Sequence, residues 1–176
     1  MLNEIRYLVE NKTVVLVGNS NTVFDNPAYK TIEQYDVIVR MNHGHRPGER
    51  TDIWLCAMCN PTPQKDFYQK FGAVINIRLN NDGRLCKELQ GKVYEWARYE
   101  TWRDNYKNVN GAMPSTGLNA IQFFLLETNP KKLYIIGYDH FETKSWYNQK
   151  PDEWHNGNAE KSIVSILEKE GKICRL

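Results

Sequence analysis

Long hydrophobic runs are absent from this chain of 176 residues. The longest uninterrupted aliphatic run covers only residues 14–17, whereas a helix needs about 20 apolar residues to cross a bilayer. The N-terminal stretch MLNEIRYLVENK contains acidic residues and lacks the apolar segment of a secretory signal. We therefore expect no membrane span and no signal peptide, and a cytoplasmic location.

An excess of one charge is also missing, because 23 Lys and Arg residues stand against 21 Asp and Glu residues. Like charges are not gathered into blocks. Proteins that bind nucleic acids or anionic membranes usually carry a basic patch or tail. The charge balance gives no reason to expect such a partner, although it does not exclude nucleic acid as a substrate.

Cysteine is scarce, with Cys56, Cys59, Cys86 and Cys174 as its four representatives. The first two have the spacing of a zinc-ligand pair, but they lie in the apolar run DIWLCAMCN. Neither a second pair nor a nearby histidine completes a set of four ligands. We expect reduced thiols in the core rather than zinc, which suits a reducing cytosol, and no metal site.

Strand-like apolar runs alternate with helical or turn-rich segments along the chain. This alternation predicts an α/β fold with a mostly parallel, twisted sheet flanked by helices, in one domain that spans residues 1–176. The predicted strands are residues 13–18, 36–40, 52–57, 73–77 and 132–137. The predicted helices are residues 27–34, 63–71, 118–127 and 158–170. Residues 85–111 show no clear division into elements.

The segment PSTGLNAIQFFLLETNP begins with small and hydroxyl-bearing residues and continues with a helical pattern. Ser115 can cap this helix. The first turn of a helix leaves backbone N–H groups unpaired and carries about half a positive charge, so Ser115, Thr116 and Gly117 suit a phosphate or carboxylate. Two interpretations stay open: an anion site, or a simple cap whose glycine allows close packing.

Small polar residues follow the predicted strands, where open α/β sheets bind their ligands. Asn19 and Asn42 can each cap a turn, but together these residues predict a polar ring at one end of the sheet. The run VGNSNTVF has one glycine and is not followed by Gly-Lys-Ser/Thr, so neither a dinucleotide fingerprint nor a P-loop is present. The ring comprises Gly18, Asn19, Ser20, Asn42, Ser115, Thr116, Gly117, Tyr138, Asp139 and His140.

Three motifs in this order resemble the eukaryotic-type sialyltransferases, glycosyltransferase family 29. Residues 14–42, VVLVGNSNTVFDNPAYKTIEQYDVIVRMN, resemble the large motif, and residues 114–139, PSTGLNAIQFFLLETNPKKLYIIGYD, the small motif. The stretch HNGNAE, with His155 and Glu160, resembles the very small motif. The resemblance implies a Rossmann-like, sialyltransferase-like glycosyltransferase fold. The short, anchor-free chain suggests a soluble member of bacterial or viral type.

The resemblance also implies roles for individual residues. His155 would be the general base for an acceptor hydroxyl, a contribution of about 10²–10⁴ in rate, while Glu160 either caps its helix or binds substrate. Tyr138, Asp139 and His140 are candidates for supporting roles. The nucleotide of a CMP-sugar donor would contact Gly18, Asn19, Ser20, Asn42, Ser115, Thr116 and Gly117.

The implied reaction transfers sialic acid or a related ulosonic acid from the CMP-sugar donor to a hydroxyl acceptor, with inversion at the anomeric carbon. The acceptor is a glycan or another hydroxyl compound, and a modified nucleic-acid base stays open. Because no Asp-x-Asp pair is present, we expect metal-independent chemistry with no cofactor. A hydrolase that consumes the donor without an acceptor is a further alternative.

The sequence departs from the family pattern at two points. Secreted members join the large and small motifs by a disulfide, but neither motif contains cysteine here. A further family motif places a histidine beside aromatic residues, whereas Trp146 and Tyr147 have no adjacent histidine and His140 is the nearest substitute. Two alternatives therefore remain: a catalytically weakened module that binds a nucleotide or nucleotide sugar, and an enzyme that uses a different nucleotide sugar.

Aromatic residues are numerous between position 94 and the very small motif. They either form a core beneath a lid or pack against sugar rings. The residues concerned are Tyr94, Trp96, Tyr99, Trp102, Trp146, Tyr147 and Trp154.

Overall fold

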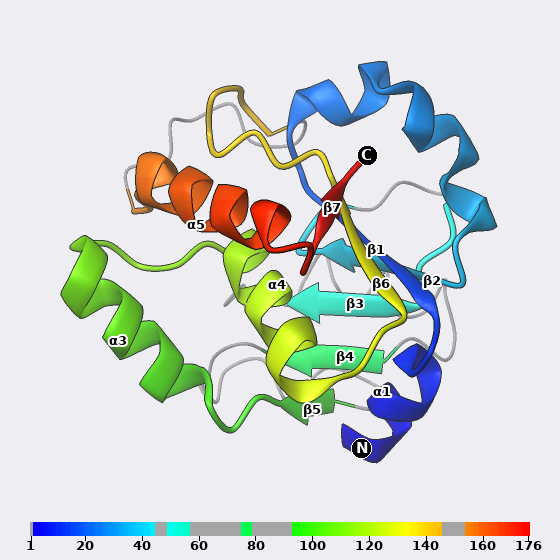
Figure 1. Cartoon of the computed structure of the whole chain (residues 1–176), viewed down its shortest axis with the longest axis horizontal. Helices are drawn as coiled ribbons and strands as arrows, with labels where there is room; N and C mark the ends of the chain where they lie inside the picture. Colours follow the sequence, from blue (N-terminus) through cyan, green and yellow to red (C-terminus); the bar gives the residue numbers. More distant parts are fainter. Residues whose placement is uncertain (1, 45–48, 57–74, 79–92, 146–153) are drawn as a thin grey trace.

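A computed structural model describes residues 2–44, 49–56, 75–78, 93–145 and 154–176 of the chain (Figure 1). In these segments seven strands form one sheet with the order β5-β4-β3-β2-β1-β6-β7. Every neighbouring pair is parallel. The strands are β1 (Thr13–Val17), β2 (Val37–Met41), β3 (Ile53–Cys56), β4 (Ile75–Arg78), β5 (Val93–Glu95), β6 (Lys132–Ile136) and β7 (Cys174–Arg175).

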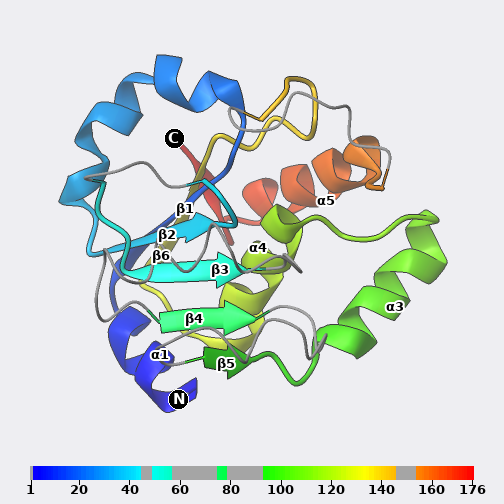
Figure 2. The same cartoon turned by 180° about the vertical axis from the view of Figure 1, so that it is seen from behind.

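Helices pack against both faces of this sheet; α4 lies in front of it in Figure 1, and Figure 2 shows it from behind. Side chains alternate between the faces along a strand, and β1 accordingly sends Val14 and Leu16 into one core cluster and Val15 and Val17 into the other. The larger cluster includes residues of α1 (Leu2–Val9), α3 (Tyr99–Asn110), α4 (Thr116–Glu127) and α5 (Gly157–Lys169). The smaller cluster includes residues of two 3₁₀ helices, η1 (Asn21–Asp25) and η2 (Pro27–Gln34).

The predicted fold class is confirmed: a parallel sheet is flanked by helices. The helices predicted at residues 118–127 and 158–170 correspond to α4 and α5. The segment 27–34 forms a 3₁₀ helix, and Asn26 caps it by accepting a hydrogen bond from the Ala28 N–H at 2.9 Å. The predicted helix at residues 63–71 lies outside the described residues.

The prediction missed several described elements: α1, η1, β7, and the strand β5 and helix α3 that lie within residues 85–111. Helix α1 has only eight residues and buries Ile5 and Val9. Strand β7 has two residues and exists because it pairs with β6. Such short elements carry too little periodicity of their own, and their tertiary partners stabilise them.

The order of the strands places a crevice at the carboxyl ends of β1 and β6. The chain proceeds from β1 outward to β5 and then returns to β6 on the other side of β1. Connections that diverge in this way leave a gap above the sheet, which is the usual ligand site of an open α/β fold. Gly18 follows β1 and Gly137 follows β6, and a Cβ on Gly18 would lie 2.2 Å from the Gly137 carbonyl oxygen. Glycine therefore allows the two backbones to meet at the base of the crevice.

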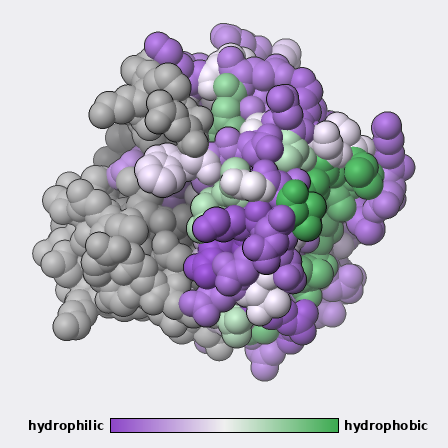
Figure 3. Space-filling view, turned by 90° about the vertical axis from the view of Figure 1, so that its left-hand side faces the viewer, coloured by the Kyte–Doolittle hydropathy of each residue, from purple (hydrophilic) through white to green (hydrophobic). Residues whose placement is uncertain are grey.

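The described surface is mostly hydrophilic on the face in Figure 3, and apolar residues occupy smaller areas of it. Within the described residues, no helix is both long and apolar enough to cross a membrane.

Candidate functional site

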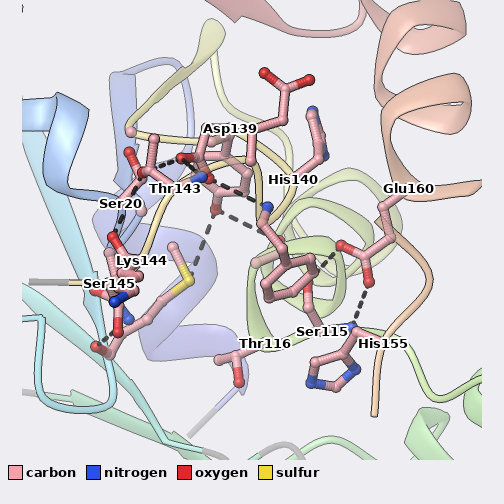
Figure 4. Close-up of a pocket in the computed structure, with 18 of the residues that line it drawn as sticks. Ser20, Ser115, Thr116, Asp139, His140, Thr143, Lys144, Ser145, His155 and Glu160 are labelled. Carbon is pink, nitrogen blue, oxygen red and sulfur yellow. Dashed lines mark hydrogen bonds between the residues drawn. The ribbon is translucent and has the colours of Figure 1, made fainter. Parts of the chain in front are cut away.

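A pocket of about 440 Å³ occupies the crevice (Figure 4). Its wall combines the loops after β1, β2 and β6 with the first turns of α4 and α5. Every site residue that the sequence predicts lines this one pocket: Gly18, Asn19, Ser20, Asn42, Ser115, Thr116, Gly117, Tyr138, Asp139, His140, His155 and Glu160. Segments far apart in the sequence thus converge on one site.

Ser115 caps α4, as its sequence position predicted. Its Oγ accepts a hydrogen bond from the Leu118 N–H at 3.1 Å. Glu160 accepts two further bonds from Ser115, at 2.7 Å from its N–H and at 2.6 Å from its hydroxyl. Both residues are buried. The polar groups of Ser115 are therefore already engaged by protein.

Glu160 is not the N-cap residue of its own helix. Asn156 caps α5 instead, by accepting from the Ala159 N–H at 3.1 Å. Glu160 lies in the first turn of α5, as its sequence position predicted, and its carboxylate contacts the start of α4. Glu160 thereby joins the starts of two helices. Its carboxylate accepts two hydrogen bonds from groups that burial would otherwise leave without a partner.

Thr116 and Gly117 follow the cap, and their backbone N–H groups have no acceptor within the part of the chain that the structure describes. Both residues line the pocket. N–H groups at a helix start attract anions. A Cβ on Gly117 would lie 2.8 Å from Cε1 of Tyr138, so glycine also lets the helix start approach the floor of the pocket.

Two asparagine side chains tie the strand loops together. Asn42 donates from Nδ2 to the Thr116 hydroxyl at 3.1 Å, and Asn19 donates from Nδ2 to the Met41 carbonyl at 3.3 Å. Asn42 has a left-handed backbone with φ of 49°, and its carbonyl accepts from the Trp54 indole at 2.8 Å. The ends of β1 and β2 are thus fixed against the start of α4.

His155 lines the pocket, and a backbone carbonyl orients its ring. Its Nδ1 lies 2.7 Å from the Met113 carbonyl oxygen, and Met113 and His155 form an isolated parallel bridge. A carbonyl only accepts, so Nδ1 carries a proton, and in the neutral ring the lone pair is then on Nε2. The ring of Phe141 stacks on the imidazole, with 5.4 Å between centroids and 19° between planes.

Tyr138 and Asp139 support the loop that follows β6. The Tyr138 hydroxyl donates to the Gly117 carbonyl at 3.4 Å. Burial, followed by the nearby charge of Glu160, raises the pKa of Tyr138 well above its usual value, so the hydroxyl stays protonated. Asp139 accepts from the backbone N–H groups of Phe141 and Thr143 at 3.2 and 2.9 Å.

His140 faces a different partner from His155. Its Nε2 lies 3.5 Å from Nη2 of Arg175, and Figure 4 shows His140 in its upper part and His155 in its lower part. Burial, followed by the positive charge of Arg175, lowers the pKa of His140. His140 is therefore neutral near pH 7 and is held by the C-terminal strand.

Several lining residues were missed by the sequence analysis. The loop after β6 contributes Phe141, Glu142, Thr143, Lys144 and Ser145. This loop is fastened to the loop after β1, because the Asn21 N–H donates to the Lys144 carbonyl at 3.1 Å and Ser20 bridges Ser145. The available signal was their position directly after Asp139 and His140, at the carboxyl end of a predicted strand.

The aromatic residues divide between two environments. Trp96 and Tyr99 are buried in the larger core cluster, and Tyr94 and Trp102 pack against it. Trp154 is 79% exposed beside His155, so it does not belong to the core. Trp146 and Tyr147 lie outside the described residues.

Within the described segments, no three His, Cys, Asp or Glu side chains form a group that could hold a metal ion. Cys174 is a free thiol of intermediate burial. The predicted burial of the remaining cysteines falls on residues whose side chains are not described.

Comparison with solved structures adds independent information about the fold. A crystal structure of a mammalian sialyltransferase aligns with 97% of this chain and 71% of the other, with a TM-score of 0.64 and 17% sequence identity. The fold is similar to that of a sialyltransferase. The crystal structure of a mammalian sialyltransferase in complex with Gal-beta-1-3GalNAc-ortho-nitrophenol gives the same coverage and identity with a TM-score of 0.60. No family model and no curated protein sequence matches the chain.

The sialyltransferase-like fold predicted from the three motifs is therefore confirmed. The expectation of a bacterial or viral type gains no support from neighbours that are mammalian. At this level of identity the likeness concerns the fold, and the chemistry of the pocket has to be argued from its own residues.

Proposed function

We propose that the protein is a glycosyltransferase that transfers sialic acid or a related ulosonic acid from a CMP-sugar to an acceptor hydroxyl, with inversion and without metal or cofactor. The observation that carries the proposal is the double attachment of residues 113–117 to the start of α5. His155 binds the Met113 carbonyl, and Glu160 binds Ser115. Residues 113–117 would thus position both the general base, His155, and the anion site at the start of α4.

The phosphate of the donor fits the first turn of α4. The N–H groups of Thr116 and Gly117, which have no acceptor among the described residues, would stabilise the charge that develops on the leaving CMP, as in other sites that place N–H donors at a developing anion. Ser115 would act indirectly, because Glu160 engages its N–H and hydroxyl and Ser115 in turn caps the helix.

The nucleotide would lie over the carboxyl ends of β1 and β2. Gly18 permits close approach of the backbones there, Ser20 lines the wall, and the side chains of Asn19 and Asn42 offer amide groups. Amides and hydroxyls suit the neutral hydrogen-bonding edge of a cytosine base and a ribose.

His155 would take the proton from the acceptor hydroxyl through Nε2. Its Nδ1–H bond to Met113 orients the ring and stabilises the positive charge that forms on the imidazole when it accepts a proton. The acceptor would be a glycan or another hydroxyl compound, and it would approach from the side of the exposed Trp154.

The proposal is tested by calorimetric titration of the purified protein with CMP, and with UMP, GMP and AMP as competitors for the same pocket. Selective binding of CMP is expected, and Thr116→Val, which removes the hydroxyl that Asn42 contacts, should weaken it. Preference for another nucleotide would replace the donor, and absence of any nucleotide binding would contradict the proposal.

Turnover is tested with CMP-linked ulosonic acids and a panel of sugar acceptors. His155→Ala should bind CMP as well as the unchanged protein does, yet lose about 10²–10⁴ in rate. Consumption of donor without acceptor would point instead to a hydrolase.

A second candidate is a module that binds the nucleotide without efficient transfer. The arrangement of His140 favours it. His140 is the nearest substitute for the second histidine of the family pattern, and its Nε2 contacts Arg175. CMP binding without turnover over the acceptor panel would support this candidate over the transferase.

A further inference from the structure

The loop after β6 contains two consecutive residues in the left-handed backbone conformation, and neither is glycine. φ is 55° at His140 and 68° at Phe141. A bulky side chain at positive φ is uncommon and carries an energetic cost. Such a backbone persists only where its surroundings hold it in place.

Side chains and backbone on both sides hold this loop. Asp139 accepts from the N–H groups of Phe141 and Thr143 at 3.2 and 2.9 Å. On the sheet side, Arg175 donates from Nη1 to the Tyr138 carbonyl at 2.6 Å. The turn is therefore fixed at its start and across its tip.

The first residue of α5 adds a steric restraint. A Cβ on Gly157 would lie 2.3 Å from the His140 carbonyl oxygen. Only glycine allows the helix start to approach the loop backbone so closely. The loop and the helix that carries Glu160 are thus packed against each other next to His155.

The consequence of this backbone is the position of the Phe141 ring. It stacks on His155 at 5.4 Å and 19°, a normal geometry for offset aromatic rings. Phe141 is 41% exposed, so burial in the core does not account for its placement. Stacking on its face and the Met113 carbonyl at Nδ1 both restrain the imidazole.

We infer that Phe141 is a positioning residue for His155, and that the left-handed loop exists to place its ring there. Restraint of the imidazole plane keeps the Nδ1–H bond to Met113 intact and keeps the lone pair of Nε2 in one direction. The inference rests on the proposed function, in which Nε2 receives the acceptor proton. Phe141 itself exchanges no proton and forms no bond with substrate.

Nitrogen NMR of the full chain with labelled histidine tests the inference without donor or acceptor. The unchanged protein should show His155 as one tautomer, protonated at Nδ1. Phe141→Ala should give a mixture of tautomers or exchange-broadened signals, and Phe141→Leu, which keeps apolar bulk but not the aromatic face, should lie between. Ile166→Ala removes a 54% exposed apolar side chain of α5 outside the pocket and should leave the signals unchanged.

The inference would be overturned if Phe141→Ala left the His155 signals as they are in the native sequence. It would also be overturned if His155 of the native sequence were not protonated at Nδ1. If Phe141→Ala fails to fold, Phe141→Leu decides: a shifted tautomer ratio supports the inference and an unchanged ratio overturns it. These signals do not depend on turnover, so failure of the proposed reaction is distinguishable from failure of the positioning role. Where transfer is measured, Phe141→Ala should lower kcat by roughly 10- to 100-fold with the KM of the donor unchanged.

Discussion

Phe141 combines a strained backbone conformation with a ring that contacts a residue of the pocket. Its backbone angle suits glycine, yet its ring occupies a defined place on the imidazole of His155. Sites often hold such conformations because the surrounding contacts outweigh the local cost.

The strain can be measured by comparing two substitutions at one position. Phe141→Ala and Phe141→Gly both remove the stacking ring, but only glycine adopts φ of 68° without a steric penalty. We expect Phe141→Gly to be more stable than Phe141→Ala by about 1 kcal/mol. Urea unfolding checks this difference, and equal or reversed stabilities would contradict a strained loop.

Glu160 is the residue on which the start of α4 depends. Glu160→Ala would leave the buried N–H and hydroxyl of Ser115 without their acceptor, at a cost of about 1–3 kcal/mol. Glu160→Gln keeps one acceptor oxygen and should lose less. Thermal unfolding measures both, and an unchanged Glu160→Ala variant would show that the two bonds contribute little. Asn158→Ala, at an exposed position of the same helix turn, is the control.

Among the elements, β1 and β2 are joined at their N-terminal ends by Asp36. Its carboxylate accepts from the Thr13 N–H at 2.8 Å and from the Thr13 hydroxyl at 2.7 Å. These bonds, the hydroxyl bond first, lower the pKa of Asp36 below its usual value of 3.8. The carboxylate form is therefore favoured in the folded state.

A lowered folded-state pKa means that the stabilisation is present above the pKa of the unfolded chain. We expect it to be lost as the pH falls below about 4. Asp36→Asn should reduce stability at neutral pH and flatten this part of the stability profile. Urea unfolding of both proteins between about pH 3 and about pH 7 measures the effect. Parallel stability profiles of Asp36→Asn and the native sequence would contradict it.

The joint between β1 and β6 can be tested by Gly18→Ala. The added Cβ would lie 2.2 Å from a backbone oxygen, so the two strand ends must separate. We expect a loss of about 1–3 kcal/mol together with weaker CMP binding. Gly111→Ala is the matched control, because φ there is 71° but no atom lies within 4 Å of the new Cβ. That variant should lose stability while CMP affinity stays unchanged; weakened binding in both variants would argue against a local effect.

At the scale of the whole molecule, the pocket joins segments from both halves of the chain. Residues 18–20, 41 and 42 come from the first half and residues 115–117, 137–145, 155 and 160 from the second. A ligand that contacts all of them should therefore stabilise the folded state as a unit.

At about 100 times its Kd, CMP should add roughly 2.7 kcal/mol, or about 5–10 °C in Tm for a chain of this length. Differential scanning calorimetry with CMP and with AMP measures the shift. Equal shifts with the two nucleotides would argue against a site selective for cytidine.

The sequence predicted the sheet well where strands are long and buried. The runs around β1, β2 and β6 are continuous and apolar, as expected for strands covered on both faces. It missed α1 and β7, because two to eight residues carry too little periodicity to predict an element that tertiary contacts stabilise.

The sequence by itself determined much of the site, although it missed residues 141–145 of the loop after β6. The motifs place small, hydroxyl and amide residues at strand ends, and the rule for open α/β sheets brings those ends together. Every predicted residue consequently lines one pocket.

Only the tertiary structure decided what each residue contacts. Glu160 contacts Ser115, and His140 contacts Arg175. Phe141, which the sequence analysis did not single out, stacks on His155. These pairs lie 45, 35 and 14 positions apart in sequence. Local propensity cannot specify such pairs, because the packing of helices and loops over the sheet sets the direction of each side chain.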